Sequence, residues 1–87
     1  MYKVKFYRKT SKSFKKIPRE YQTKIKNVVN KLSIDPFALD IKKLNPPYEA
    51  SHRLRVGSYR LFLDIDTSSK VIIILDVTRR TTQTYSH

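Results

Sequence analysis

Three arginines stand close together in the sequence, at Arg53, Arg55 and Arg60. They flank the dipeptide Gly57-Ser58, which is typical of a two-residue β-turn. If this turn joins two paired strands, Arg55 lies directly opposite Arg60 and Arg53 lies opposite Phe62. Directly opposed residues share one face of a sheet. The spacing therefore predicts that all three guanidiniums point to one side, which we call the arginine face (Arg53, Arg55 and Arg60).

Three cations on one small patch need an anionic neighbour. Like charges that face each other across paired strands are destabilising, and the one nearby carboxylate, Asp64, cannot neutralise three guanidiniums. The planar guanidinium group donates two parallel hydrogen bonds to a phosphate. We therefore expect a phosphate-binding site, the alternative being a solvated sheet face whose arginines extend into water.

Further groups near the end of the chain could reach the same face. Arg79 and Arg80 follow an apolar run, and Tyr85 carries a ring that can stack on a base and a phenol that can relay a proton. If the apolar run is a strand paired with the one after the turn, these three side chains surround the arginine face. Docking of Tyr85 on the surface, without a functional role, is the alternative.

Other site chemistries find little support in the sequence. The chain has one glycine and no cysteine, so neither a glycine-rich phosphate loop nor a thiolate zinc site is expected. The late acids Asp64, Asp66 and Asp76 fall in a turn or at strand ends, which does not suggest a metal cluster. We predict no metal and no small-molecule cofactor.

Hydrophobic periodicity predicts the elements that position these residues. Alternation over residues 2–6 predicts a strand, and Thr10 and Ser11 are suitable N-caps for a short helix. Pro18 can begin a second helix, which Asp35-Pro36 ends. The apolar stripe of this second helix consists of Tyr21, Ile25, Val28, Val29 and Leu32.

The remainder of the chain is predicted to be mainly β structure. Residues 37–50 are expected to form a connector, and strands are expected over 51–56 and 59–65. An almost wholly apolar strand over 71–77 is predicted to be covered on both faces. The order β-α-α-β-β-β predicts an α+β fold, with a helical hairpin on one face of an antiparallel sheet and a single domain over 1–87.

The charge of the chain indicates a polyanionic partner. Nineteen Lys and Arg residues against seven Asp and Glu residues give a net charge of +12, which favours nucleic acid or an acidic protein. The polar side of the second helix carries Lys24, Lys26 and Lys31, which we predict to contact RNA, simple solvation being the alternative. No apolar run is long enough for a bilayer and the first residues do not resemble a signal peptide, so no membrane association and a cytoplasmic location are expected.

The segment Leu54-Arg55-Val56-Gly57-Ser58-Tyr59-Arg60 resembles the RelE/ParE superfamily of type II toxins. The β-α-α start, Asp35-Pro36, Lys43-Leu44, the apolar strand, Arg79-Arg80 and a late tyrosine match as well, so the likeness covers nearly the whole chain. The resemblance implies one four-stranded antiparallel sheet packed on two helices: an N-terminal strand, a helical hairpin and a three-stranded meander. It also implies a cognate antitoxin, which we expect to be acidic and to fold on this surface.

The resemblance further implies roles for individual residues. Arg53, Arg60 and Arg80 match basic catalytic positions of RelE-type enzymes, and Tyr85 matches their late tyrosine. Arg55 and Arg79 match neighbouring positions that hold RNA. Some family members have lysine where Arg53 stands; an arginine stabilises a phosphorane but is a poor base, so the general base is left unassigned.

The function that follows from this resemblance is that of a metal-independent mRNA endoribonuclease. Such a toxin acts in the ribosomal A site, touches mRNA and ribosomal RNA, and uses the 2′-hydroxyl as nucleophile. Two alternatives remain open in the sequence. One is a ParE-like inhibitor of DNA gyrase that cuts nothing itself, and the other is an inactive member that only binds antitoxin or RNA.

Overall fold

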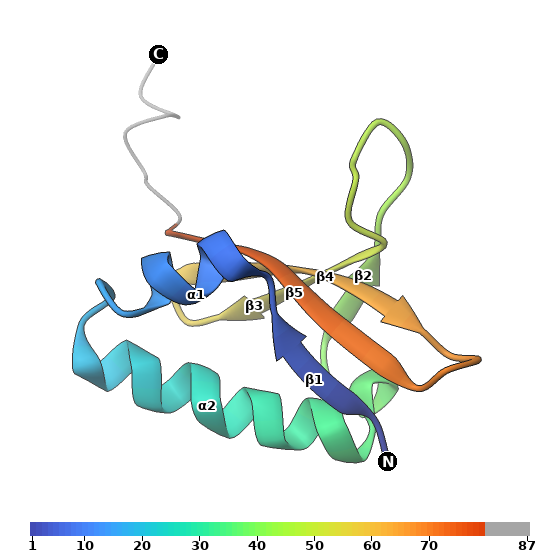
Figure 1. The fold of residues 1–87 in the computed structure, drawn as a ribbon, viewed down its shortest axis with the longest axis horizontal. Helices are drawn as coiled ribbons and strands as arrows, with labels where there is room; N and C mark the ends of the chain where they lie inside the picture. The colour runs from blue at the N-terminus through green and yellow to red at the C-terminus, as the bar shows by residue number, and fades with distance from the viewer. Residues whose placement is uncertain (80–87) are drawn as a thin grey trace.

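The computed structural model describes residues 1–79, in which two helices pack against one face of a five-stranded sheet (Figure 1). This confirms the α+β class and the helical hairpin. No helix in residues 1–79 is long and apolar enough to cross a membrane. The elements in chain order are β1 (Lys3–Phe6), α1 (Arg8–Phe14), α2 (Arg19–Ile34), the 3-10 helix η1 (Pro36–Ala38), β2 (Ile41–Lys43), β3 (His52–Val56), β4 (Tyr59–Asp66) and β5 (Val71–Arg79).

The sheet differs from the expected four antiparallel strands in two ways. Its order is β1-β5-β4-β3-β2, and β1 runs parallel to β5, whereas the other neighbours are antiparallel. The fifth strand is β2, which lies inside the predicted connector and pairs with β3. Three residues are too few to display a period of two, so no strand signal marks β2 in the sequence. Pairing direction is likewise not encoded in periodicity.

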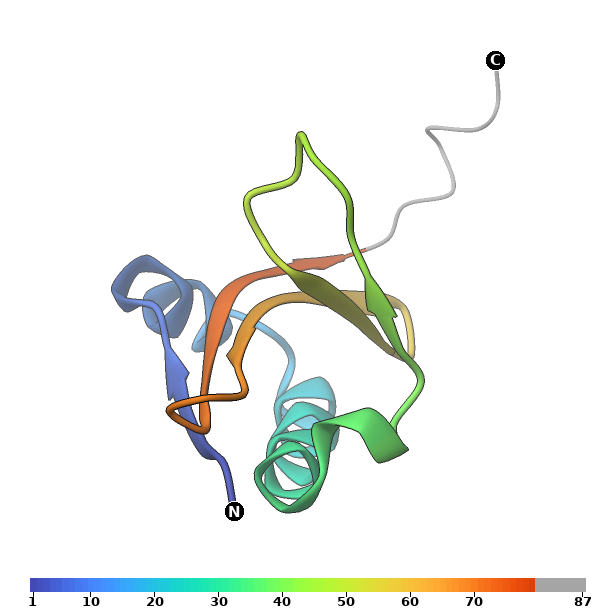
Figure 2. The same cartoon turned by 90° about the vertical axis from the view of Figure 1, so that its right-hand side faces the viewer.

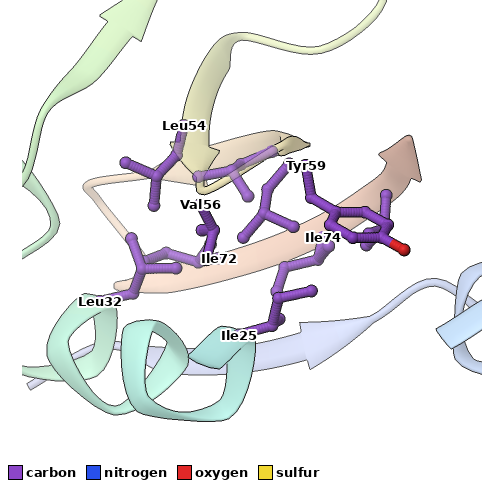
Figure 3. Packing of buried hydrophobic residues seen from close by; sticks show 10 residues of the cluster. Ile25, Leu32, Leu54, Val56, Tyr59, Ile72 and Ile74 are labelled. Atoms are coloured by element: carbon purple, nitrogen blue, oxygen red, sulfur yellow. The ribbon is translucent and has the colours of Figure 1, made fainter. Parts of the chain in front are cut away.

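The core lies between the helices and the sheet (Figure 3). Ile25 and Leu32 of α2 are both 0% exposed and stand seven residues apart on the predicted apolar stripe. They pack against buried residues of three strands, namely Leu54, Val56, Tyr59, Leu61, Leu63, Ile72, Ile74 and Val77. The predicted second helix and its buried face are therefore confirmed.

The first helix begins earlier than predicted. It starts at Arg8 after Tyr7, and neither Thr10 nor Ser11 serves as its N-cap. The Thr10 side chain is buried, and its hydroxyl donates a hydrogen bond to the carbonyl of Leu75 in β5. Thr10 thus joins α1 to the sheet, a tertiary contact that the local capping pattern does not reveal.

Candidate nucleic-acid interface

The hairpin of β3 and β4 has the predicted register. Arg55 is paired with Arg60 and Arg53 with Phe62, so the arginine face exists as a set of neighbours on one side of the sheet. Leu54 and Leu61 form the intervening pair and are 3% and 0% exposed on the helix side. The guanidiniums therefore point away from the helices, as expected.

Gly57 fixes this register at the turn. Its φ angle is +60°, a left-handed conformation that favours glycine over residues with a Cβ atom. The ring of Tyr21 in α2 lies beneath it, 3.8 Å from where a Cβ atom would stand. A shift of the strand register by one residue would move the arginines of the shifted strand to the core side, so Gly57 helps to determine which way the cations point.

Arg60 occupies the centre of the arginine face. Its backbone neighbours across the two adjacent strands are Arg55 and Thr78. The Nε atom of Arg60 is buried and has no hydrogen-bond partner within residues 1–79. A buried donor without a partner costs about 1–3 kcal/mol, and more when the group is charged. An anion that accepts from this nitrogen would relieve that penalty.

Lys42 adds a fourth cation that the sequence analysis did not single out. It is paired with Arg53 across β2 and β3, which places it on the same side of the sheet as the arginine face. Lys42, Arg53 and Arg55 line a small hollow of about 100 Å³, together with Asp40. The alternation of Ile41 and Lys42 was the available signal, but it was too short to identify a strand.

Arg79 does not join the arginine face. It is paired with Tyr59, whose side chain is buried on the helix side, while Thr78 takes the place beside Arg60. An irregularity in the β4–β5 ladder between Phe62 and Leu63 is the reason, because one extra residue in a strand reverses which side chains face each way. The expectation for Arg79 was wrong in this respect, whereas Arg80 and Tyr85 lie outside the described residues.

The lysines of α2 are separate from the arginine face. Lys24, Lys26 and Lys31 are all exposed on α2, which covers the opposite side of the sheet (Figure 1). At 100° per residue, Lys24 and Lys31 share one flank of the helix and Lys26 lies on the other. The Nζ atom of Lys24 is 5.3 Å from the ring centroid of Tyr21, close to the turn end of the hairpin. These lysines therefore lie apart from the arginine face, on both flanks of α2, and we refer to them together as the second basic surface (Lys24, Lys26 and Lys31).

His52 lies on the core side at the far end of β3 from the turn. It is half-buried, its Nδ1 is 2.8 Å from the hydroxyl of Ser51, and its ring meets Phe37 edge-on at 6.0 Å. Burial and the nearby Lys43 ammonium lower the pKa of His52, although the Asp64 carboxylate opposes the shift. His52 takes no part in the arginine face.

Two carboxylates of β4, those of Asp64 and Asp66, accept hydrogen bonds from backbone amides. Asp64 accepts a hydrogen bond from the Ser51 amide at 3.0 Å, and Asp66 accepts from the amides of Ser68 and Ser69. These backbone bonds lower the pKa of Asp66. Within residues 1–79, no group of three His, Cys, Asp or Glu side chains is arranged to hold a metal ion.

The family of the chain follows from a comparison with family models. The model described as the ParE toxin of the type II toxin-antitoxin system, parDE, matches residues 4–84. The chain belongs to the ParE toxin family. The toxin is thus a member of the RelE/ParE superfamily, as the hairpin motif indicated. No curated protein sequence matches it.

Solved structures share the fold of the toxin over nearly its whole length. The archaeal RelE–RelB complex from Pyrococcus horikoshii is 25% identical with a TM-score of 0.80, covering 93% of this chain and 97% of that one. The RelBE2 toxin–antitoxin complex from Mycobacterium tuberculosis is 26% identical with a TM-score of 0.81, covering 91% and 98%. The RelB–RelE complex from Methanococcus jannaschii is 26% identical with a TM-score of 0.68, covering 94% and 95%.

Proposed function

We propose that the toxin is a metal-independent endoribonuclease that cuts mRNA on the ribosome. The observation that carries the proposal is Arg60, whose buried Nε lacks a partner while Arg55 and Thr78 stand on either side. A scissile phosphate seated there accepts hydrogen bonds from the guanidiniums of Arg55 and Arg60 and from the hydroxyl of Thr78. The similar folds of RelE toxins support the same assignment.

The reaction needs cations and two proton transfers. The 2′-oxygen of the ribose forms a bond to phosphorus, and the bond from phosphorus to the 5′-oxygen breaks. The 2′-proton passes to a base, and the departing 5′-oxygen receives a proton from an acid. Arg53, Arg55 and Arg60 stabilise the charge that develops on the phosphorane. Arg80 and Tyr85 are proposed to act on the departing 5′-oxygen, directly or through water.

Lys42 is our candidate for the base. Guanidiniums remain protonated at neutral pH and are poorly suited to accept the 2′-proton. A lysine amine, unlike a guanidinium, can serve as a general base, and Lys42 lies beside Arg53 on this face. The position that holds a lysine in some family members is occupied by Arg53, so the amine comes instead from the neighbouring strand.

The partners follow from the same surfaces. An acidic antitoxin is proposed to bind and neutralise the toxin, as RelB accompanies RelE in the similar structures. The second basic surface, with Lys24, Lys26 and Lys31, is proposed to contact ribosomal RNA while the arginine face holds mRNA. Arg79, on the helix side at the end of β5, belongs with this second surface.

The decisive experiment compares Arg60→Ala with Arg19→Ala, which removes the same charge from the exposed start of α2. Arg60→Ala is expected to abolish translation-dependent mRNA cleavage and growth arrest, because the phosphate loses its central ligand. Arg19→Ala is expected to retain both. Cleavage by Arg60→Ala at the wild-type rate would contradict the proposal.

Inhibition of DNA gyrase is the second candidate, favoured by the match to a ParE family model. Growth arrest accompanied by gyrase-dependent DNA breaks, with mRNA left intact, would support it. A wild-type toxin that neither arrests growth nor cuts mRNA would instead be an inactive member that binds antitoxin or RNA alone. The three results exclude one another, so a single induction experiment separates them.

A further inference from the structure

The loop between β2 and β3 stands above the sheet on the side opposite α2 (Figure 2). Between this loop and the sheet is a hollow of about 450 Å³, which is within the usual range of small-ligand pockets. We call it the loop hollow. It is lined by Tyr48 and Glu49 of the loop and by Phe62, Leu75 and Asp76 of the sheet.

The loop hollow adjoins the arginine face through the strand pairing. Phe62 in its floor is the direct partner of Arg53, and Asp76 is the partner of Phe62 on the other side. The row that contains Arg60 and Thr78 lies two residues further along the strands. Two residues correspond to about 7 Å, a separation that a ribose can bridge between its phosphate and its base.

Aromatic rings at the hollow suit a nucleobase. Phe62 is half-buried in the floor, and Tyr48 is 60% exposed at the wall, so the Tyr48 ring is accessible to a ligand in the hollow. Stacking of an unpaired base on an aromatic ring contributes about 1–3 kcal/mol. Neither ring has an aromatic partner within the described residues.

The acids of the loop hollow indicate which base would fit. A carboxylate only accepts hydrogen bonds. The Oδ1 atom of Asp76 accepts from the Val77 amide at 2.9 Å, which orients the carboxylate, and Asp76 lines the hollow together with Glu49. Guanine presents two adjacent donors, N1–H and the N2 amino group, on its Watson–Crick edge. Uracil presents a single N–H between two carbonyl oxygens, which a carboxylate repels.

We propose that the loop hollow binds an unpaired guanine whose flanking phosphate lies on the arginine face. Tyr48 and Phe62 stack on the base, and Asp76 accepts from its Watson–Crick edge with Glu49 close by. This proposal rests on the proposed function, because it takes RNA as the ligand of the arginine face. The proposal assigns the preference for a base to the loop hollow, which is separate from the arginine face that holds the phosphate.

The test measures binding of the full chain to two short labelled RNAs at low salt. One is an oligouridylate and the other carries a single guanosine in its middle, so that neither forms a folded structure. The wild-type toxin is expected to bind the guanosine-containing RNA about tenfold more tightly, as one good bidentate contact allows. Asp76→Asn is expected to abolish this preference, because the amide presents a donor where the carboxylate presented an acceptor.

Two further variants complete the design. Glu20→Gln removes one negative charge from α2, as Asp76→Asn does from β5. It is expected to keep the preference for guanosine, and to show the same general gain in RNA affinity that the lost charge causes in Asp76→Asn. Tyr48→Ala, in the exposed loop, tests the stacking independently should Asp76→Asn not fold. It is expected to weaken binding of the guanosine-containing RNA more than that of oligouridylate.

The outcomes separate this proposal from the proposed function. Equal binding of both RNAs by the wild type, or a preference that survives Asp76→Asn and Tyr48→Ala, overturns the guanine site and leaves the arginine face as an RNA site. No binding of either RNA overturns the guanine site and also the arginine face as a site that binds RNA without the ribosome. A preference that persists in these variants while they lose affinity for a peptide from the antitoxin would overturn the guanine site and assign the loop hollow to the protein partner.

Discussion

Arg55 and Arg60 face each other across paired strands, an arrangement that folding alone disfavours. The neighbouring cations Lys42 and Arg53 increase the repulsion. The same four side chains, however, present several donors to one phosphate, and Arg60 has a buried nitrogen that such a ligand would satisfy. The residues of this face are therefore suited to binding rather than to stability.

Replacing Arg55 by threonine should stabilise the free toxin. The change removes one member of an opposed cationic pair and introduces a good strand former, so the free energy of unfolding should rise by about 0.5 kcal/mol. Urea denaturation measures this. Lys5→Thr on β1 is the control, since it removes the same charge from an exposed strand position away from the face. An equal rise in both variants would assign the effect to net charge.

The assignment of Lys42 as a base can be checked by changing its chemistry and keeping its charge. Lys42→Arg should retain RNA binding but lower the cleavage rate by roughly 10²–10⁴-fold, because a guanidinium does not accept the proton. Single-turnover cleavage measures the rate, and a wild-type rate would remove Lys42 from the mechanism.

His52 should make stability depend on pH. Its pKa is lower in the folded chain than in the unfolded one, because burial and Lys43 disfavour the charged ring. The unfolded state therefore binds more protons, and the contribution of His52 is complete above its unfolded pKa of about 6.5 and declines as the pH falls below it. Urea midpoints across this range should fall less steeply in His52→Gln, and identical slopes would contradict the account.

At the scale of elements, strand β5 joins β1 to the rest of the sheet. It pairs with both β1 and β4, and over residues 71–74 its side chains alternate between the helix side and the opposite side. Ile72 and Ile74 are 0% exposed beneath the helices, whereas Ile73 is half-buried on the other side. This difference predicts that shortening the side chain of Ile74 lowers the free energy of unfolding more than the same change at Ile73.

Ile74→Val should destabilise the toxin by about 0.5–1.5 kcal/mol, because one methyl group is lost from a fully packed site. Ile73→Val removes the same group from a partly covered site and should have a smaller effect. The free energies of unfolding of the two variants give the comparison. A larger loss for Ile73→Val would mean that the side opposite the helices is covered more fully than the structure shows.

At the scale of the whole molecule, two basic surfaces lie on opposite sides of one core. The arginine face is on the open side of the sheet, and the α2 lysines are beyond the helix layer. The sheet and the helix layer separate the two surfaces, and a ribosome is large enough to contact both. The cations behind the net charge of +12 thus include two separate surfaces. One is proposed to hold mRNA and the other to contact ribosomal RNA.

The salt dependence of RNA binding should separate these surfaces. Affinity for a short RNA should fall steeply as salt rises, and Arg60→Ala should reduce the slope of log K against log salt by about 0.7 for each lost phosphate contact. Lys26→Ala should leave that slope unchanged but weaken binding to ribosomes. Fluorescence titrations over a salt series measure the slopes, and equal effects of the two substitutions on the short RNA would contradict the division.

Most of the arginine face was predictable because its determinants are local. The turn at Gly57-Ser58 and the alternation on either side set which residues oppose each other, and the observed pairing of Arg55 with Arg60 follows from them. The apolar stripe of α2 is local in the same sense. Short-range patterns of this kind survive in the fold because burial of the same side chains stabilises both the element and the core.

By itself, the sequence determined the α+β class, the buried stripe of α2 and the side of the hairpin on which the arginines lie. Only the tertiary structure decided that β2 adds Lys42 to that side, and that the irregularity beside Phe62 moves Thr78 next to Arg60 and turns Arg79 away. The reason is that these placements depend on pairing between distant segments. A single extra residue in a ladder reverses the facing of every side chain beyond it, and no local pattern records that shift.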